Sequence, residues 1–317
     1  MDKANIKLSV CMSAYNAGKY IEQALDSILM QKTNFVFEIL IGEDPSKDNT
    51  RTLIEAYRDR YPDIVRLFLT TERIGANATL LKLIENSRGE YVAQIDADDF
   101  LLNENRLQAM ADFLDTHPQH AACINNYKVV DEEGKTTVED AYGEDYKHVE
   151  MDHFLYKAAF GGMAMWRRSS MPVPIPAWLY KVGPKTDFAI MMVVSAGKLV
   201  GYLPERFMAY RRHSQSLGSL SNKEEMLNRD IYMCKRFREY YAPLDKKYDA
   251  IFKSGASYYG YILSYSKLSK GRVFSFLYYF IMAFINWPTL SAKKHKDYLF
   301  MASPELFYKI KSFFGRK

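Results

Sequence analysis

Cysteine is scarce in this chain, which has 317 residues and only three cysteines, Cys11, Cys123 and Cys234. Their number is odd and they lie far apart, so neither a disulfide framework nor a zinc cluster is indicated. A reduced, cytoplasmic compartment fits this pattern best. The first nine residues contain no apolar run as long as the core of a signal peptide, and secretion is therefore not expected.

Long apolar runs are also lacking. The longest extends from Val273 to Trp287 and is shorter than the roughly 20 residues that a membrane-spanning helix needs. Since this run is rich in tyrosine, we expect a buried or interfacial helix there. The net charge of +5 is too small to indicate a nucleic acid as partner.

The positive charge is concentrated at the C-terminal end of the sequence, where basic residues are mixed with phenylalanines. The residues concerned are Lys293, Lys294, Lys296, Lys309, Lys311, Arg316 and Lys317, together with Phe300, Phe307, Phe313 and Phe314. Two interpretations of this tail stay open. It rests as a peripheral anchor on an anionic membrane surface at the inner face, or it is the solvated basic end of a helical domain.

Strand-like apolar runs alternate with helical patterns in the first hundred residues. Strands are predicted at 8–12, 37–42, 65–69 and 91–95, and helices at 19–31, 51–61 and 76–87. This alternation is typical of a doubly wound α/β fold with a mixed, mainly parallel sheet. Ligands of such sheets gather at the carboxyl ends of the strands, where the loops carry polar motifs.

The later part of the sequence predicts two domains, at residues 1–220 and 221–317. The first binds the ligands, and the second is a helical extension rich in aromatic and basic residues. Within the first domain, the twin glycines Gly161 and Gly162 permit close approach of the backbone to a ligand, and a simple bulge is the alternative.

The most informative segment is the apolar run from Tyr91 to Ile95, which is followed by three carboxylates, Asp96, Asp98 and Asp99. Side chains alternate faces along a strand, so a strand through this segment would let Asp96 and Asp98 share one divalent cation. A hard ion held by one or two carboxylates keeps positions for phosphate oxygens. The alternative is that the aspartates only open a turn and cap a helix, which explains one of them better than three.

Six short motifs follow one another between residues 7 and 220. They are Ser13-Ala-Tyr-Asn16, Glu43-Asp-Pro-Ser-Lys-Asp-Asn-Thr50, Arg73-Ile-Gly-Ala-Asn77, Asp96-Ala-Asp-Asp99, Thr186-Asp187 and Tyr210-Arg-Arg-His213. Each motif alone is weak, but their order and spacing resemble the inverting nucleotide-sugar glycosyltransferases of family 2. The resemblance implies the glycosyltransferase-A fold for this part of the chain.

The resemblance also implies which residues hold the nucleotide. They are Ala14, Tyr15, Asp44, Arg73, Asn77 and Asp96. A carboxylate suits position 44 because it accepts hydrogen bonds from an imide N–H or from ribose hydroxyls, and the family often has a second aspartate where this chain has Glu43. Three alternatives stay open. Asp44 and Ser46 cap the next helix, Arg73 is an exposed cation without a ligand, and Asn77 caps its own helix.

For the chemistry, the resemblance implies a Mn²⁺ or Mg²⁺ ion bound by Asp98 and His213, which neutralises charge on the departing nucleoside diphosphate. Asp187 is the implied general base, because inversion requires removal of the acceptor proton on the face opposite the diphosphate. The family commonly has Glu-Asp where this chain has Thr186 and Asp187, and an N-cap role is the alternative. Asp99 and the twin glycines are candidate contacts to the donor or acceptor sugar.

These expectations describe a hexosyl- or N-acetylhexosaminyltransferase of cell-surface polysaccharide synthesis. The donor is a nucleotide sugar, with UDP first and GDP or dTDP open, and the acceptor is a saccharide or a lipid-linked oligosaccharide. A nucleotidyltransferase is disfavoured because the loop after the first predicted strand has no basic residue before Lys19. A catalytically inactive glycan-binding protein is disfavoured because Asp96, Asp98 and Asp187 are all present.

Overall fold

The computed structural model describes residues 6–141, 148–149, 163–214, 216, 222–269, 275 and 278. The chain divides into two compact units, Met1–Ser219 and Leu220–Lys317. Gly161, Gly162 and the basic tail lie outside the described residues, as does the apolar run at 273–287 apart from two of its positions.

The runs predicted as strands form one sheet in the first unit, in the order β3-β2-β1-β4-β9-β6-β10-β5. β1 (Ile6–Ala14), β2 (Val36–Glu43), β3 (Val65–Leu69) and β4 (Tyr91–Gln94) are parallel. β6 (His120–Val130) and β10 (Leu199–Arg211) are parallel to each other, and β9 (Ala164–Arg167) runs antiparallel between β4 and β6. Shorter pieces are β5 (Phe100–Leu101), β7 (Thr136–Val138) and β8 (His148–Val149).

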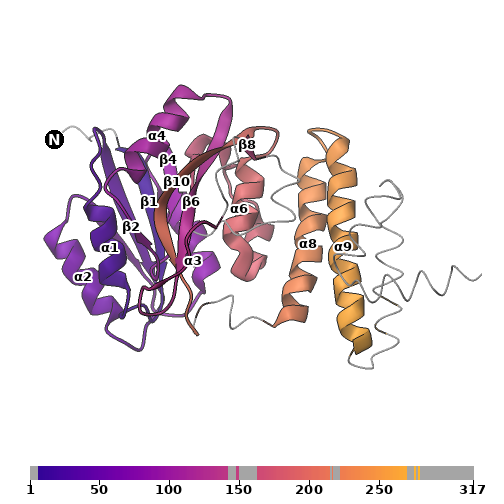
Figure 1. Cartoon of the computed structure of the whole chain (residues 1–317), viewed down its shortest axis with the longest axis horizontal. Coiled ribbons are helices and arrows are strands. Elements are labelled where there is room, and N and C mark those ends of the chain that lie inside the picture. The colour runs from indigo at the N-terminus through magenta and orange to yellow at the C-terminus, as the bar shows by residue number, and fades with distance from the viewer. Residues whose placement is uncertain are drawn as a thin grey trace, which may run out of the picture. The chain divides into compact units, whose positions relative to one another are not determined.

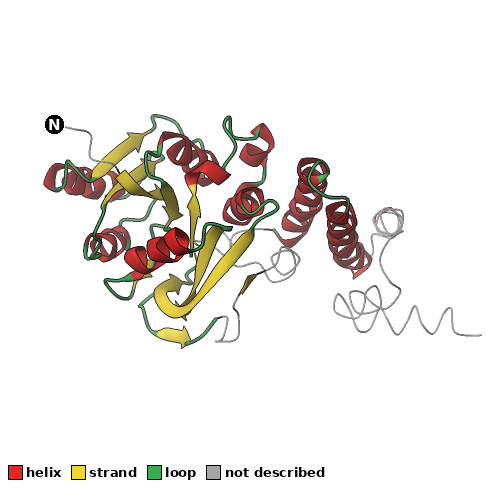
Figure 2. Cartoon of the chain, turned by 90° about the horizontal axis from the view of Figure 1, so that it is seen from above, coloured by secondary structure: helices red, strands yellow, loops and turns green. Residues whose placement is uncertain are grey.

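Helices cover both faces of this sheet (Figures 1 and 2). They are α1 (Ile21–Leu29), α2 (Thr50–Arg60), α3 (Ala76–Asn86), α4 (Arg106–Thr116) and α6 (Thr186–Val194), with 3₁₀ turns at Arg168–Ser170, Ala177–Lys181 and Gly183–Lys185. α1 shows why they form, because Ile21, Ala24, Leu25 and Ile28 recur at helical spacing and are all buried. The predicted mixed, mainly parallel α/β fold is confirmed.

The direction of strand addition reverses at β1. β2 and β3 lie on one side of it, and the chain then returns through α3 to add β4 on the other side. The carboxyl ends of β1 and β4 therefore flank a topological switch point, which is where open α/β sheets bind their ligands. Because β1 is covered on both faces, Leu8, Val10, Cys11 and Met12 are all fully buried, as expected of an interior parallel strand.

The second unit contains α8 (Lys223–Tyr241) and α9 (Lys247–Ser269), which lie side by side (Figure 1). Their interface is aromatic. The ring centroid of Phe252 lies 5.6 Å from that of Phe237 and 5.1 Å from that of Tyr241. Within the described residues, no helix combines the length and the apolar composition needed to cross a bilayer.

Candidate active site

The loops after β1, β2 and β3 contact one another. Ala14 ends β1, is 4% exposed, and accepts at its C=O a hydrogen bond of 3.3 Å from the N–H of Asp44. The next residue is Tyr15, and the guanidinium carbon of Arg73 lies 4.1 Å from the centroid of its ring. Two nucleotide contacts predicted from separate motifs thus form a cation–π pair.

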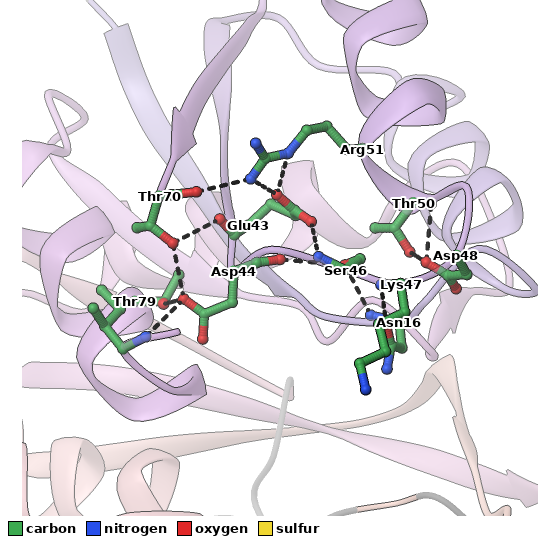
Figure 3. A network of polar contacts seen from close by, with 11 residues as sticks. Asn16, Glu43, Asp44, Ser46, Lys47, Asp48, Thr50, Arg51, Thr70 and Thr79 are labelled. Carbon is green, nitrogen blue, oxygen red and sulfur yellow. Dashed lines mark hydrogen bonds and ion pairs between the residues drawn. The ribbon is translucent and has the colours of Figure 1, made fainter. Parts of the chain in front are cut away.

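Asn16 joins the loops after β1 and β2 (Figure 3). Its φ of 49° is left-handed, a conformation that asparagine tolerates better than most residues. Its N–H donates to Oγ of Ser46 at 3.0 Å, and its Oδ1 accepts the N–H of Lys47 at 2.8 Å. The N–H of Gly18 also donates to the carboxylate of Asp48, at 2.9 Å. The two loops therefore form one hydrogen-bonded frame.

Glu43 is fully buried and has a structural partner (Figure 3). Its Oε2 accepts a hydrogen bond of 2.7 Å from Nε of Arg51, and its Oε1 accepts the N–H of Ser46 at 2.9 Å. Arg51 also donates to the C=O of Thr70, at 2.9 Å. This ion pair ties the ends of β2 and β3 to α2.

Asp44 is 2% exposed, and its carboxylate holds the chain that leads into α3. Its Oδ2 accepts the N–H of Gly75 at 2.7 Å, and its Oδ1 accepts the N–H of Ile74 at 3.2 Å and the hydroxyl of Thr70 at 3.1 Å. The capping alternative is not observed, since Asn49 takes the N-cap position of α2. The nucleotide contact of Asp44 stays a prediction.

A turn, and not a strand, gathers the three aspartates. β4 ends at Gln94, and the N–H of Asp99 donates to the C=O of Asp96 at 3.2 Å. The strand geometry predicted for this segment is therefore wrong, because the chain leaves the sheet before the first aspartate. The turn brings carboxylate oxygens of Asp96, Asp98 and Asp99 within 4.8 Å of one another, so the third carboxylate joins the first two.

Asp98 and Asp99 have different surroundings. Oδ2 of Asp98 lies 2.8 Å from Nε2 of His213, so the two predicted metal ligands are in contact. Asp99 is 1% exposed, and its Oδ1 accepts the N–H of Arg211 at 2.8 Å. Its Oδ2 has no hydrogen-bond partner in the part of the chain that the structure describes. A buried carboxylate oxygen without a partner is costly unless a cation or a proton meets it.

Burial, followed by the charges of neighbouring carboxylates, raises the pKa values of Asp96 and Asp99. Burial raises the pKa of Asp96 to about 7, and the charges of Asp98 and Asp187 add to this shift. Burial, followed by the charges of Asp98 and Asp96, raises the pKa of Asp99 well above its usual range. Three convergent carboxylates beside an imidazole form an oxygen-rich donor set with one nitrogen, which fits a divalent cation such as Mg²⁺ or Mn²⁺.

Asp187 lies in the first turn of α6 and is half-buried. Burial raises its pKa, while the N–H of Phe188 and the charge of Lys185 oppose the shift. The N-cap position of α6 belongs to Lys185, so the N-cap alternative for Asp187 is not observed. Because the charge of Asp187 contributes to the raised pKa of Asp96, the two carboxylates share one electrostatic environment.

Asn77 points toward the segment that leads into α6. Its Nδ2 donates to the C=O of Leu179 at 3.0 Å, and its Oδ1 accepts a hydrogen bond from the hydroxyl of Thr186. The capping alternative is not observed here either, since Gly75 takes the N-cap position of α3. The ribose contact predicted for Asn77 stays a prediction.

Arg211 is a residue of this site to which the sequence assigned no role. It is 3% exposed, and its guanidinium donates to the C=O of Asp98 at 3.0 Å, to the C=O of Glu132 at 2.9 Å and to Oε1 of Gln23 at 2.6 Å. It therefore fixes the acidic turn to two other segments. The signal in the sequence was a charged residue at the end of an apolar strand, two positions before His213.

A doubly wound sheet with an acidic turn at its switch point is the arrangement expected of the glycosyltransferase-A fold. The model of the family described as glycosyl transferase family 2 matches residues 9–172, and the chain belongs to this family. The family predicted from the sequence is thereby confirmed.

Relatives and solved structures are similar to this chain. Protein Rv1520 of Mycobacterium tuberculosis is 28% identical over 211 residues, which cover 66% of this chain and 60% of that protein, so the match spans less than two thirds of this relative. The structure of residues 1–349 of S. aureus TarS superposes with a TM-score of 0.63 and 17% identity, covering 88% of this chain and 81% of that chain.

Two further structures contain ligands. TarS 1–349 in complex with UDP-GlcNAc has a TM-score of 0.58 and 14% identity, with 90% of this chain and 93% of that chain covered. The mannosyltransferase PcManGT from Pyrobaculum calidifontis, in complex with GDP-Man and Mn²⁺, has a TM-score of 0.54 and 15% identity, with 99% and 89% covered. At these identities the likeness establishes the fold.

Proposed function

We propose that this protein transfers a sugar from a nucleoside diphosphate to a hydroxyl group of a saccharide or lipid-linked acceptor, with inversion at the anomeric carbon. The observation that carries the proposal is the acidic turn at the switch point, where carboxylate oxygens of Asp96, Asp98 and Asp99 lie within 4.8 Å of one another and the imidazole of His213 contacts Asp98. The reaction needs an acidic group that holds the cation of the leaving diphosphate and a separate carboxylate that takes the acceptor proton.

The donor half of the proposed site is formed by the loops after β1, β2 and β3. The stacked pair of Tyr15 and Arg73 offers a flat aromatic face and a planar cation, which suit a nucleobase and a diphosphate. The TarS complexes with UDP-GlcNAc and UDP favour a UDP-sugar of the hexosyl or N-acetylhexosaminyl class. GDP-Man, the ligand of PcManGT, is the donor with which the UDP-sugars are to be compared.

We assign the divalent cation to Asp98, with the imidazole of His213 and Oδ2 of Asp99, which has no hydrogen-bond partner among the described residues, beside it. The Mn²⁺ ion of PcManGT supports this choice of metal class. When bound, such an ion supplies Lewis-acid stabilisation of the charge on the departing diphosphate. Arg211 holds the turn through its backbone, so the carboxylates are oriented by the fold itself.

Asp187 takes the proton of the acceptor hydroxyl as its oxygen attacks the anomeric carbon. The bond from that carbon to the diphosphate oxygen breaks, and the nucleoside diphosphate leaves with the electron pair. Burial raises the pKa of Asp187, which makes it a stronger base than a solvated carboxylate. The dipole of α6 acts on the same group and favours its ionised form before the attack.

The acceptor we propose is a cell-surface polysaccharide or its lipid-linked precursor, at the cytoplasmic face of the membrane. Support comes from the basic and aromatic sequence of the tail. The relative TarS is named as a poly(ribitol-phosphate) beta-N-acetylglucosaminyltransferase.

The decisive experiment measures release of nucleoside diphosphate by the purified full chain with Mn²⁺ and UDP-GlcNAc, UDP-glucose or GDP-mannose, after a thermal-shift screen has ranked the donors. We expect slow release from one donor, abolished by EDTA and by Asp187→Asn. Asp112→Asn, which changes an exposed aspartate of α4, is the matched control. Release of pyrophosphate, or no release from any donor, would contradict the proposal.

A further inference from the structure

The side chain of Asn77 bridges two parts of the first unit that are distant in sequence. It belongs to the first turn of α3, yet its amide is engaged by the segment before α6. Nδ2 donates to the C=O of Leu179 at 3.0 Å, and Oδ1 accepts the hydroxyl of Thr186. Both polar atoms of this amide are therefore used to connect α3 with the start of α6.

The other end of this connection is the carboxylate of Asp44. It accepts the N–H groups of Ile74 and Gly75, and the hydroxyl of Thr79 lies 3.5 Å from its Oδ1. Gly75 has a φ of 88°, which a residue with a side chain adopts only with strain. The first turn of α3 is thus fixed to the loop after β2, which belongs to the donor half of the site.

Thr186 stands directly before the candidate base, Asp187. It is 6% exposed, and its hydroxyl lies between Oδ1 of Asn77 and the C=O of Gly183, which is 2.7 Å away. A hydroxyl carries one proton, so its position is set by these two acceptors together. Because Thr186 and Asp187 are adjacent in the first turn of α6, a shift of Thr186 moves Asp187 as well.

The start of α3 is therefore fixed on both sides: the carboxylate of Asp44 holds the backbone of Ile74 and Gly75, and Asn77, two residues further along the chain, bonds to Thr186. We propose that Asn77 and Thr186 are positioning residues, which orient Asp187 from the donor side of the site. The inference rests on the proposed function, since it needs Asp187 to be the base. It explains how a base on α6 is held in a fixed position relative to the start of α3, although Asn77 precedes Thr186 by 109 positions.

The test compares Thr186→Val with Thr186→Ser. Valine has nearly the same shape but no hydroxyl, whereas serine keeps the hydroxyl. We expect Thr186→Val to lower kcat for UDP-GlcNAc hydrolysis by about 10- to 100-fold, because misplacement of a catalytic group is costly. The Kd for UDP with Mn²⁺, measured by calorimetry, stays within about twofold of wild type, and Thr186→Ser recovers most of kcat. A merely structural role would not lower kcat while leaving the Kd for UDP unchanged.

Asn77→Ala removes the other partner of the hydrogen bond with Thr186, and it provides the test if Thr186→Val does not fold. We expect a similar loss of kcat, and a less than additive loss in the double variant, because both changes remove the bond between Oδ1 of Asn77 and the hydroxyl of Thr186. Wild-type kcat in Asn77→Ala, or additive losses in the double variant, would overturn the inference while Asp187→Asn stays inactive. A wild-type protein that hydrolyses no nucleotide sugar, or an active Asp187→Asn variant, would overturn the proposed function and this inference with it.

Discussion

His213 and Asp98 are 115 positions apart in the sequence, and Nε2 of the first lies 2.8 Å from Oδ2 of the second. One follows β10 and the other follows β4, and Arg211 holds both segments together through its backbone N–H and its guanidinium. The ring of Tyr20 packs against the imidazole with centroids 5.0 Å apart. The contact is therefore built into the fold, and it orients the carboxylate to which we assign the metal.

Asp98→Asn should weaken Mn²⁺-dependent binding of UDP by at least about tenfold, because the amide has lost the charge that holds the cation. Calorimetric titration of UDP with and without Mn²⁺ measures the effect. The two proteins should bind UDP alike when Mn²⁺ is absent, and Asp112→Asn should behave as wild type. Wild-type affinity of Asp98→Asn in the presence of Mn²⁺ would remove this residue from the metal site.

Asp187→Asn should leave UDP binding nearly unchanged and lower kcat about 100-fold or more, the range typical of a lost general base. The expected result separates the two halves of the site, since the donor loops do not include residue 187. Steady-state turnover of UDP-GlcNAc and calorimetry with UDP provide the two measurements. Unchanged turnover would exclude Asp187 from the mechanism.

The metal-free protein should lose stability as the pH rises toward neutrality. The pKa of Asp96 in the folded state is raised from 3.8 to about 7. Protonation therefore favours the folded state, so this contribution is complete below about pH 3.8 and is lost as the pH rises through about 7. A bound cation prefers the ionised carboxylate and should restore stability above pH 7.

Melting temperatures between pH 5.5 and pH 8, with and without Mn²⁺, test this linkage. Asp96→Asn should flatten the decline of the metal-free protein with pH, since the amide does not titrate. Equal pH dependence in wild type and variant would show that Asp96 titrates normally.

Arg51→Met should destabilise the first unit, because it leaves the fully buried Glu43 without its cation. We expect a loss of roughly 2 to 3 kcal/mol in the free energy of unfolding, since Arg51 itself is partly exposed. Urea denaturation followed by circular dichroism measures it. Arg58→Met, on the same helix but paired only at the surface with Asp59, should change little. Equal effects of the two substitutions would contradict a structural role for the buried pair.

Deletion of residues 288–317 should reduce flotation with liposomes that contain anionic lipids, if the basic and phenylalanine-rich tail rests on a membrane. Neutral liposomes provide the control, because they offer no charge for the lysines. Equal flotation with and without the tail would leave the solvated alternative.

Much of the fold could be predicted because interior parallel strands have a simple signature. Strand β3, over Val65–Leu69, agrees with the predicted range residue by residue, and helix α3, over Ala76–Asn86, ends one residue before its predicted end. The acidic turn was harder. An apolar run leading into aspartates predicts a strand, whereas the point at which the chain leaves the sheet is set by pairing of β4 with β1 and β9.

The contacts within the site were predicted less well, for a physical reason. Asp44 accepts hydrogen bonds from residues about thirty positions away, and Asn77 meets Thr186 across 109 positions. Nothing in the local sequence encodes such a contact, because each residue type has a local use, such as helix capping, that looks equally good. The sequence could therefore identify these residues as candidate site residues, but only the fold shows which residues they contact.

The long strand β10 has a practical consequence for anyone who prepares shorter versions of the protein. The family match stops at residue 172, but α6, β10 and His213 all come later. A product cut at that point would leave β6 with a bare edge where β10 should lie, and exposed edges invite aggregation. The smallest expressible piece should therefore continue through His213, about forty residues past the end of the family match.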